Sequence, residues 1–186
     1  MLKQIVLFTL LGAKIMAVEP ETVVLGAGCF WCVEAIYERI DGVISVEAGY
    51  SNGITEKPTY QDVCGGNTGY AEVAKIRFDP QKVSFSEILD MFWKSHDPTT
   101  LNRQGADVGT QYRSGIYFQS DLQKEIAEKS MTNAQTAFNQ NIVTEIEPLD
   151  QYYTAEDYHQ NYYENNKNAP YCSYVIAPKL KKLNLK

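Results

Sequence analysis

Hydrophobic and polar residues follow regular periods along most of this chain, and these periods predict alternating strands and helices. Short apolar or alternating runs bounded by turn formers predict strands; they lie at residues 23–25, 43–50, 71–78, 111–119 and 142–146. Apolar residues that recur at i, i+3 and i+4 predict helices; they lie at residues 29–40, 85–96, 120–138 and 154–163. Turn formers predict loops at residues 58–69 and 99–110, and coil is predicted from Tyr171 onward.

The order of these elements indicates a fold class. A β-α-β-β-α-β order followed by further elements is typical of a ferredoxin-like core, a split βαβ arrangement. We therefore expect an α+β two-layer sandwich with a mixed sheet, helices on one face and a C-terminal coil extension. The chain has 186 residues, of which 44% are hydrophobic, and we detect no repeat or low-complexity tract. These numbers predict a single catalytic domain over residues 21–186.

Residues 1–20 differ from the rest of the chain. Lys3 precedes the apolar run 5–11, and the segment closes with the small residue Ala17. A charged start, a short apolar run and a small residue at a cleavage point are typical of a signal peptide, and the run is too short to span a bilayer. Two alternatives stay open: a cleaved signal peptide with export to the periplasm, or an N-terminal extension of a cytoplasmic protein.

Charge excludes one class of partner. The formal net charge is −6, and the lysines gather only in a modest C-terminal tail at residues 179–186. Proteins that bind nucleic acid usually carry a dense basic patch, so we expect no nucleic-acid partner. We also expect no stable association with membranes, and a monomer.

The candidate chemistry centres on Cys29, which the pattern places in the first turn of a predicted helix. The free N–H groups and the helix dipole at that end favour an anion, so we expect a thiol of lowered pKa that acts as a nucleophile. Phe30 and Trp31 follow it and offer an apolar wall to a small uncharged group. Cys32 completes a C-x-x-C spacing, which also fits a dithiol oxidoreductase or half of a zinc site.

Glu72 is a candidate acid. In the alternating strand 71–78 it falls on the same face as Ala74, Ile76 and Phe78. A carboxylate on an apolar face is costly to ionise and its pKa rises there, which suits a general acid. The alternative is a side chain that reaches water at the edge of the strand.

Together these residues indicate one reaction type. A thiolate attacks an electrophilic atom, an acid protonates the oxygen attached to that atom, and a second thiol clears the oxidised cysteine. Only two histidines, His96 and His159, occur in the chain, and neither forms an evident pair with a cysteine. Hydrolysis of the papain type is therefore disfavoured, whereas a dithiol oxidoreductase and a structural zinc module using all four cysteines remain as alternatives.

Four motifs resemble those of the A-type peptide methionine sulfoxide reductases. They are Gly28-Cys29-Phe30-Trp31, Thr68-Gly69-Tyr70-Ala71-Glu72, the run from Asn102 to Ser114, and Ala155-Glu156-Asp157-Tyr158-His159-Gln160. The resemblance extends in the same order from about Thr22 to Pro178. It implies reduction of the S epimer of methionine sulfoxide, free or in oxidised proteins, with thioredoxin or a similar dithiol as reductant. It implies no metal, flavin or nicotinamide cofactor.

The resemblance also implies a role for each site residue. Cys29 is implied to be the nucleophile, Glu72 the proton donor and Cys172 the resolving thiol. Tyr60 and Tyr112 are implied to donate hydrogen bonds to the sulfoxide oxygen, and Asp107 to form the polar wall of the pocket. Phe30 and Trp31 are implied to contact the substrate methyl group, and Tyr162 to lie near the active site.

Two positions depart from the family pattern. Cys32 stands where many members have glycine, so it could resolve Cys29 directly, act in a relay with Cys172, or tune the thiolate. We favour Cys172 as the resolving thiol, because the asparagine-rich stretch before it could move. Tyr70 replaces a histidine that is common in the family, so any role of that histidine is in doubt here.

Overall fold

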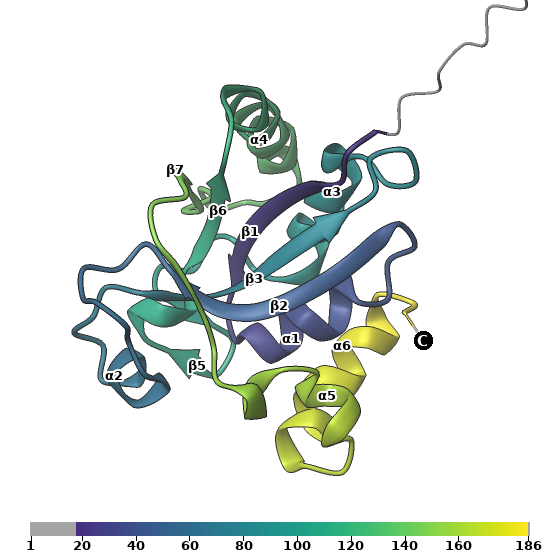
Figure 1. Cartoon of the computed structure of the whole chain (residues 1–186). Coiled ribbons are helices and arrows are strands. Elements are labelled where there is room, and N and C mark those ends of the chain that lie inside the picture. The colour runs from purple at the N-terminus through teal and green to yellow at the C-terminus, as the bar shows by residue number, and fades with distance from the viewer. Residues whose placement is uncertain (1–17, 186) are drawn as a thin grey trace, which may run out of the picture.

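The computed structural model describes residues 18–185 (Figure 1). The strands are β1 (Glu21–Ala27), β2 (Val43–Ser51), β3 (Ala71–Phe78), β4 (Arg103–Gln104), β5 (Asp107–Val108), β6 (Ser114–Phe118), β7 (Glu145–Pro148) and β8 (Tyr152–Thr154). The helices are α1 (Phe30–Tyr37), α2 (Tyr60–Cys64), α3 (Phe85–Ser95), α4 (Asp121–Ala134), α5 (Tyr162–Asn165) and α6 (Ala177–Lys182). Single 3₁₀ turns lie at Thr110–Tyr112, Gln135–Ala137 and Asp157–His159, and a π-helical turn spans Cys172–Ile176.

Six strands form the main sheet in the order β7-β6-β1-β3-β2-β8. The central four pair antiparallel in the order β6-β1-β3-β2, which is the arrangement of a split βαβ fold. At one edge β7 runs parallel to β6, and at the other β8 runs antiparallel to β2. The expected α+β fold with a ferredoxin-like core and a mixed sheet is therefore confirmed.

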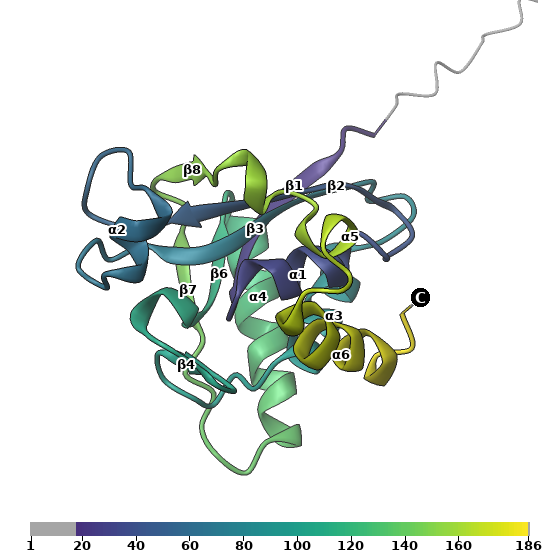
Figure 2. The same cartoon turned by 90° about the horizontal axis from the view of Figure 1, so that it is seen from below.

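The main core lies between the sheet and the helices on one of its faces. Figure 2 shows α1, α3 and α6 together on that side. Successive strand residues point to opposite faces, so Leu25 and Ile76 enter this core with Phe92 of α3 while Val24 joins a smaller cluster on the other face. Two helix starts follow sequence rules: Ser84 forms the capping box that opens α3, and Ser120 caps α4.

A glycine fixes the turn between β1 and α1. Gly28 has φ +88°, a backbone conformation that side-chain-bearing residues rarely adopt. A Cβ at this position would lie 2.6 Å from Cβ of Gln104, in the loop that carries β4 and β5. The chain therefore turns sharply, and Cys29 becomes the N-cap residue of α1.

The C-terminal segment differs from the expectation. Coil was expected from Tyr171 onward, but Cys172–Lys182 is helical, first as a π turn and then as α6. Cys172, Ile176 and Leu180 recur every four residues, and all three are buried against the core. Pro178, which has no backbone N–H, sits in the first turn of α6 directly after the π turn. Burial of this stripe makes the segment a packed helix.

Short elements account for the other differences. The expected loops contain α2 and the β4–β5 hairpin, and β8 was not expected at all. The strand expected over 111–119 begins only at Ser114, after a 3₁₀ turn that holds Tyr112. The possible signal peptide falls mostly on residues 1–17, which lie outside the described residues. Between residues 18 and 185, no helix is both long and apolar enough to cross a membrane.

Candidate active site

The Cys29 thiol stands at the N-terminal end of α1, as the sequence predicts. The backbone carbonyl of Cys29 accepts hydrogen bonds from the amides of Cys32 (3.0 Å) and Val33 (3.4 Å), which is the opening turn of the helix. The residue is 8% exposed, so it is nearly buried yet still reaches the surface.

Glu72 reaches this helix start from β3. Its side chain is 1% exposed, and its Oε2 accepts a hydrogen bond from the Phe30 amide at 3.1 Å. Burial raises the pKa of Glu72 to about 8, against smaller opposing effects of hydrogen bonds from Phe30 and Cys29. The expectation that Glu72 lies on the apolar face is confirmed. At neutral pH this carboxyl group holds a proton next to Cys29.

The thiol of Cys29 is not acidic in this state. Burial raises its pKa well above 9.0, and donation of a hydrogen bond to Cys32 and the charge of Glu72 raise it further. The expected lowering by the helix start is therefore wrong here, because loss of hydration outweighs the helix dipole. Cys32 accepts that hydrogen bond, and its pKa falls to about 7, with a further lowering by Lys179. The two thiols therefore lose their protons as a coupled pair.

Aromatic rings build the apolar wall. Phe30, Tyr50 and Tyr60 gather around Cys29, with ring centroids 5.9 Å (Phe30 to Tyr50) and 6.4 Å (Phe30 to Tyr60) apart. The Trp31 indole stacks on Tyr162 at a centroid distance of 3.6 Å and an interplanar angle of 5°. The expected substrate-contacting residues are thus brought together, from α1 and from α5, which lie far apart in the chain.

Tyrosine hydroxyls and one carboxylate form the polar side. Tyr60 and Tyr112 both pack against the cluster that contains Cys29. Burial first, and then the charge of Glu72 among other neighbours, raises the pKa of both phenols, so they remain hydrogen-bond donors at neutral pH. Asp107 of β5 accepts a 2.7 Å hydrogen bond from the hydroxyl of Tyr171, and that hydroxyl lies 3.7 Å from Sγ of Cys32.

The other two thiols occupy different surroundings. Cys172 is fully buried and belongs to the same apolar cluster as Cys32, whereas Cys29 belongs to the neighbouring cluster. Burial raises the pKa of Cys172, and the nearby Cys32 adds to the rise. Cys64 is exposed at the end of α2. In the described part of the chain no three side chains of metal-binding type gather together, so a structural zinc site has no donor set there.

Residues that were not predicted as site residues hold this wall in place. His159 accepts a hydrogen bond from the Trp31 indole N–H at its Nδ1 (3.1 Å), and its Nε2 lies 4.0 Å from Glu156. Glu156 itself accepts hydrogen bonds from the Tyr50 hydroxyl (2.8 Å) and the Tyr60 amide (2.9 Å). Both lie in the motif at 155–160, so its spacing could have pointed to them. Glu34, in the middle of α1, and Tyr171 were also missed.

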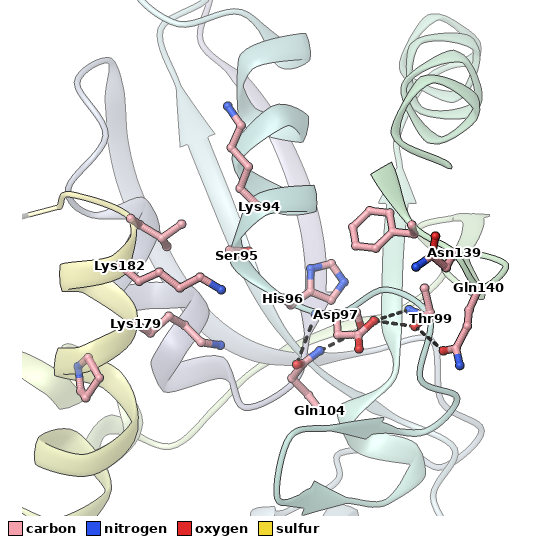
Figure 3. A pocket seen from close by; sticks show the side chains of 13 residues that line it. Lys94, Ser95, His96, Asp97, Thr99, Gln104, Asn139, Gln140, Lys179 and Lys182 are labelled. Carbon is pink, nitrogen blue, oxygen red and sulfur yellow. Dashed lines mark hydrogen bonds between the residues drawn. The ribbon is translucent and has the colours of Figure 1, made fainter. Parts of the chain in front are cut away.

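A surface cavity of about 730 Å³ is a separate feature. Figure 3 shows it between α3 and α6, with Lys179 and Lys182 extending toward it. No cysteine lines it. His96 on its wall is bonded through Nδ1 to the carbonyl of Phe92 and through Nε2 to Ser114, and burial lowers its pKa to about 4. His96 therefore binds the end of its own helix and is far too weak a base for catalysis at neutral pH.

Known proteins share this arrangement. The family model described as peptide methionine sulfoxide reductase matches residues 21–186. A peptide methionine sulfoxide reductase MsrA from Saccharolobus solfataricus is 52% identical over 162 residues, 87% of this chain and 92% of the relative. One from Leptospira borgpetersenii is 53% identical over the same shares of both chains.

Solved structures agree with the sequence relatives. Reduced Mxr1 from Saccharomyces cerevisiae superposes with a TM-score of 0.79 at 37% identity, covering 83% of this chain and 90% of Mxr1. Methionine sulfoxide reductase A of Corynebacterium diphtheriae superposes with a TM-score of 0.75 at 37% identity, covering 87% of this chain and 80% of that structure. Mxr1 in complex with Trx2 superposes with a TM-score of 0.57 at 27% identity, covering 82% of this chain and 91% of that Mxr1 chain. The chain belongs to the peptide methionine sulfoxide reductase family of the A type and is a thiol-dependent oxidoreductase that acts on methionine sulfoxide.

Proposed function

We propose that Cys29 attacks the sulfur of methionine S-sulfoxide, free or in an oxidised protein, while Glu72 protonates the sulfoxide oxygen. Cys32 takes the thiol proton of Cys29 as the new sulfur–sulfur bond forms. The protonated oxygen of this adduct then moves from the substrate sulfur to Sγ of Cys29. The S–O bond and the new S–S bond break and an O–Sγ bond forms, so that methionine leaves as a thioether and Cys29 becomes a sulfenic acid. The observation that carries this mechanism is the buried, protonated carboxyl group of Glu72 beside the Cys29 thiol.

Several polar groups support the transition state in this proposal. The hydroxyls of Tyr60 and Tyr112 donate hydrogen bonds to the sulfoxide oxygen, because both face the Cys29 cluster and stay protonated. Donors aimed at the place where negative charge develops stabilise that charge most in a site with little water. Asp107, held by Tyr171, binds the polar main chain of the substrate.

Trp31, Phe30 and Tyr162 select the substrate. The sulfoxide sulfur carries a methyl group, which is small and uncharged, and aromatic rings bury such a group favourably. The Trp31–Tyr162 stack fixes the plane of the indole, so one wall of the pocket has a defined orientation. A chiral pocket with donors on one side and rings on the other accepts one epimer of the sulfoxide, here the S epimer.

Regeneration proceeds as a relay among three thiols. Cys32 attacks the sulfenic acid of Cys29, which forms a Cys29–Cys32 disulfide and releases water. Cys172 then attacks the sulfur of Cys32, and Cys29 leaves as a free thiol. The order is supported by the contact between Cys29 and Cys32 and by the position of Cys172 next to Cys32. The π-helical turn Cys172–Ile176 must loosen for the second step, because Cys172 is fully buried.

The final electrons come from a dithiol protein. Thioredoxin reduces the Cys32–Cys172 disulfide by exchange, gaining a disulfide of its own. Support comes from the structural neighbour Mxr1, which has been solved in complex with Trx2. We place the protein as a monomer without stable membrane association in this cycle.

A single-turnover experiment tests the proposal. With one equivalent of methionine S-sulfoxide and no reductant, the wild-type protein is expected to form one methionine per chain and to lose two free thiols. Cys29→Ser is expected to form none, whereas Cys64→Ser, which removes the exposed thiol, is the matched control and behaves as wild type. Methionine formed at the normal rate by Cys29→Ser would refute the assignment of the nucleophile.

A further inference from the structure

Glu34 is a buried carboxylate that joins two distant segments. It lies in the middle of α1 and is only 1% exposed. Its Oε1 accepts a hydrogen bond from the Asn161 amide at 2.8 Å, and its Oε2 accepts one from the Tyr162 amide at 3.1 Å. Both oxygens are therefore used to hold the start of α5 against α1.

The segment that Glu34 holds is also tied to Arg39 by the Arg39–Glu164 ion pair, and its tyrosines pack against the core. Helix α5 has four residues, and no side chain caps its first turn from within the segment. Asn161 has φ +51°, in the left-handed region that an asparagine tolerates. Because short helices are marginal by themselves, the two bonds to Glu34 matter most at the Asn161 and Tyr162 backbone, where α5 begins.

Tyr162 connects the start of α5 to the proposed substrate pocket. Its ring stacks on the Trp31 indole, three residues before Glu34 on the same helix. The chain of contacts therefore runs from Glu34 through the Tyr162 backbone and ring to Trp31. We propose that Glu34 is a positioning residue for the sulfoxide pocket, whose ionised carboxylate keeps Tyr162 stacked on Trp31 and whose protonation releases that stack.

The proposal rests on the proposed role of Trp31 and Tyr162 as the wall that holds the substrate methyl group. Protonation has a direct effect in this geometry. An ionised carboxylate accepts both backbone N–H groups, whereas a protonated one presents an O–H donor toward one of them. Loss of one of the two bonds frees the start of α5.

Burial and the neighbouring charges place the protonation of Glu34 near neutral pH. Burial raises the pKa of Glu34 to about 7, the two backbone hydrogen bonds oppose the rise, and Glu38 adds to it. Other charged or titratable groups lie on or beside the elements that pack around it: Arg39 just after α1, Glu164 and Tyr163 on α5, His159 before α5, Tyr152 on β8, Glu47 on β2 and Lys75 on β3. Arg39 is paired with Glu164 and Lys75 with Glu47, so neither cation is left to neutralise Glu34.

A spectroscopic titration tests the inference without any turnover. The chain has two tryptophans, so Trp93→Phe leaves Trp31 as the only one, and its stack with Tyr162 contributes to the near-ultraviolet circular dichroism. In this background we expect the tryptophan signal to change with a midpoint near pH 7. Added Glu34→Gln is expected to give the low-pH signal at every pH, because the amide cannot accept both N–H groups with its two ends.

Glu38→Gln is the matched control on the same helix. It removes the neighbouring like charge, so the transition should persist with a midpoint at lower pH. Absence of the transition in the parent, its survival in Glu34→Gln, or an unmoved midpoint in Glu38→Gln would each overturn the proposal. None of these signals depends on Cys29, so they separate this proposal from the proposed mechanism.

Kinetics provide a second readout. We expect Glu34→Gln to raise KM for methionine S-sulfoxide roughly two- to tenfold, which is the range that an aromatic pair of this kind is worth. The single-turnover rate at saturating substrate should be unchanged, because Cys29 and Glu72 are untouched. In the wild type KM should rise as the pH falls below about 7, and in the variant it should not. A loss of the saturated rate with an unchanged KM would contradict a positioning role.

Discussion

Replacing Glu72 by glutamine tests two properties of this carboxyl group: its role as a proton donor and the cost of ionising it inside the folded protein. The amide is nearly the same shape, and its oxygen can still accept the hydrogen bond that Glu72 receives from the Phe30 amide at 3.1 Å. It cannot give a proton to the sulfoxide. We expect the single-turnover rate to fall by about 10²–10⁴, the range usual for acid–base groups. The wild-type rate should also fall as the pH rises through about 8, where Glu72 loses its proton, and the variant should lack this dependence.

The same substitution should stabilise the fold at high pH. The pKa of Glu72 rises from 4.5 to about 8 on folding. Each unit corresponds to about 1.36 kcal/mol, so ionising the buried carboxyl group costs up to about 5 kcal/mol. Because the folded protein holds this proton more tightly, the associated stability is fully present below pH 4.5 and is lost as the pH rises through about 8. Glutamine avoids the loss, since it never ionises.

Urea unfolding at several pH values measures this difference. Both proteins should carry Cys29→Ser, so that the nucleophile does not titrate with its neighbour. The free energy of unfolding of the Glu72→Gln protein, minus that of its parent, should increase between about pH 5 and about pH 9 by several kcal/mol. Two parallel stability curves would refute the reasoning, because they would mean that Glu72 ionises as easily in the folded protein as in the unfolded chain.

Two further substitutions probe the geometry around Cys29. Cys32→Ser should keep the first turnover but stop steady-state reduction by thioredoxin, as measured by methionine formed per chain; full steady-state activity would exclude the relay. Gly28→Ala should destabilise the fold by at least about 1–2 kcal/mol in urea unfolding, because its φ is +88° and the new Cβ would meet Gln104 at 2.6 Å; unchanged stability would contradict the turn described here.

Long periodic elements could be predicted from the sequence, and short ones could not. Strand β3 and helix α3 each carry a clear alternation or a capping box, so local chemistry and the final fold agree there. Strand β8 and the β4–β5 hairpin have two or three residues per strand, too few for any period to show. Strand β8 forms because β2, far earlier in the chain, offers a sheet edge, whereas β4 and β5 pair with each other.

The C-terminal helix was not predicted, although its apolar spacing is visible in the sequence. Coil was expected from Tyr171 onward. The four-residue spacing of Cys172, Ile176 and Leu180 was present in the sequence, but a stripe becomes helical only when a core is there to bury it. The consequence is functional, because the expected mobile tail is instead a packed helix that must open before Cys172 can exchange disulfides.

Electrostatics was the least predictable part of the site. A two-residue period was enough to place Glu72 on the buried face, since that property belongs to a single strand. The pKa of Cys29 depends on how much water the whole pocket excludes, and the helix dipole that guided the prediction is a smaller effect than that loss of hydration.

Glu34 depends on a still more distant feature, the backbone amides of residues 161 and 162, which no local pattern in α1 could announce. The two buried carboxyl groups therefore act in opposite protonation states. Burial keeps Glu72 protonated so that it can donate, whereas two backbone N–H groups allow Glu34 to ionise near neutral pH so that it can hold. Acidification should accordingly preserve the proton donor while it weakens the pocket wall, and substrate affinity should fall on that side of neutrality.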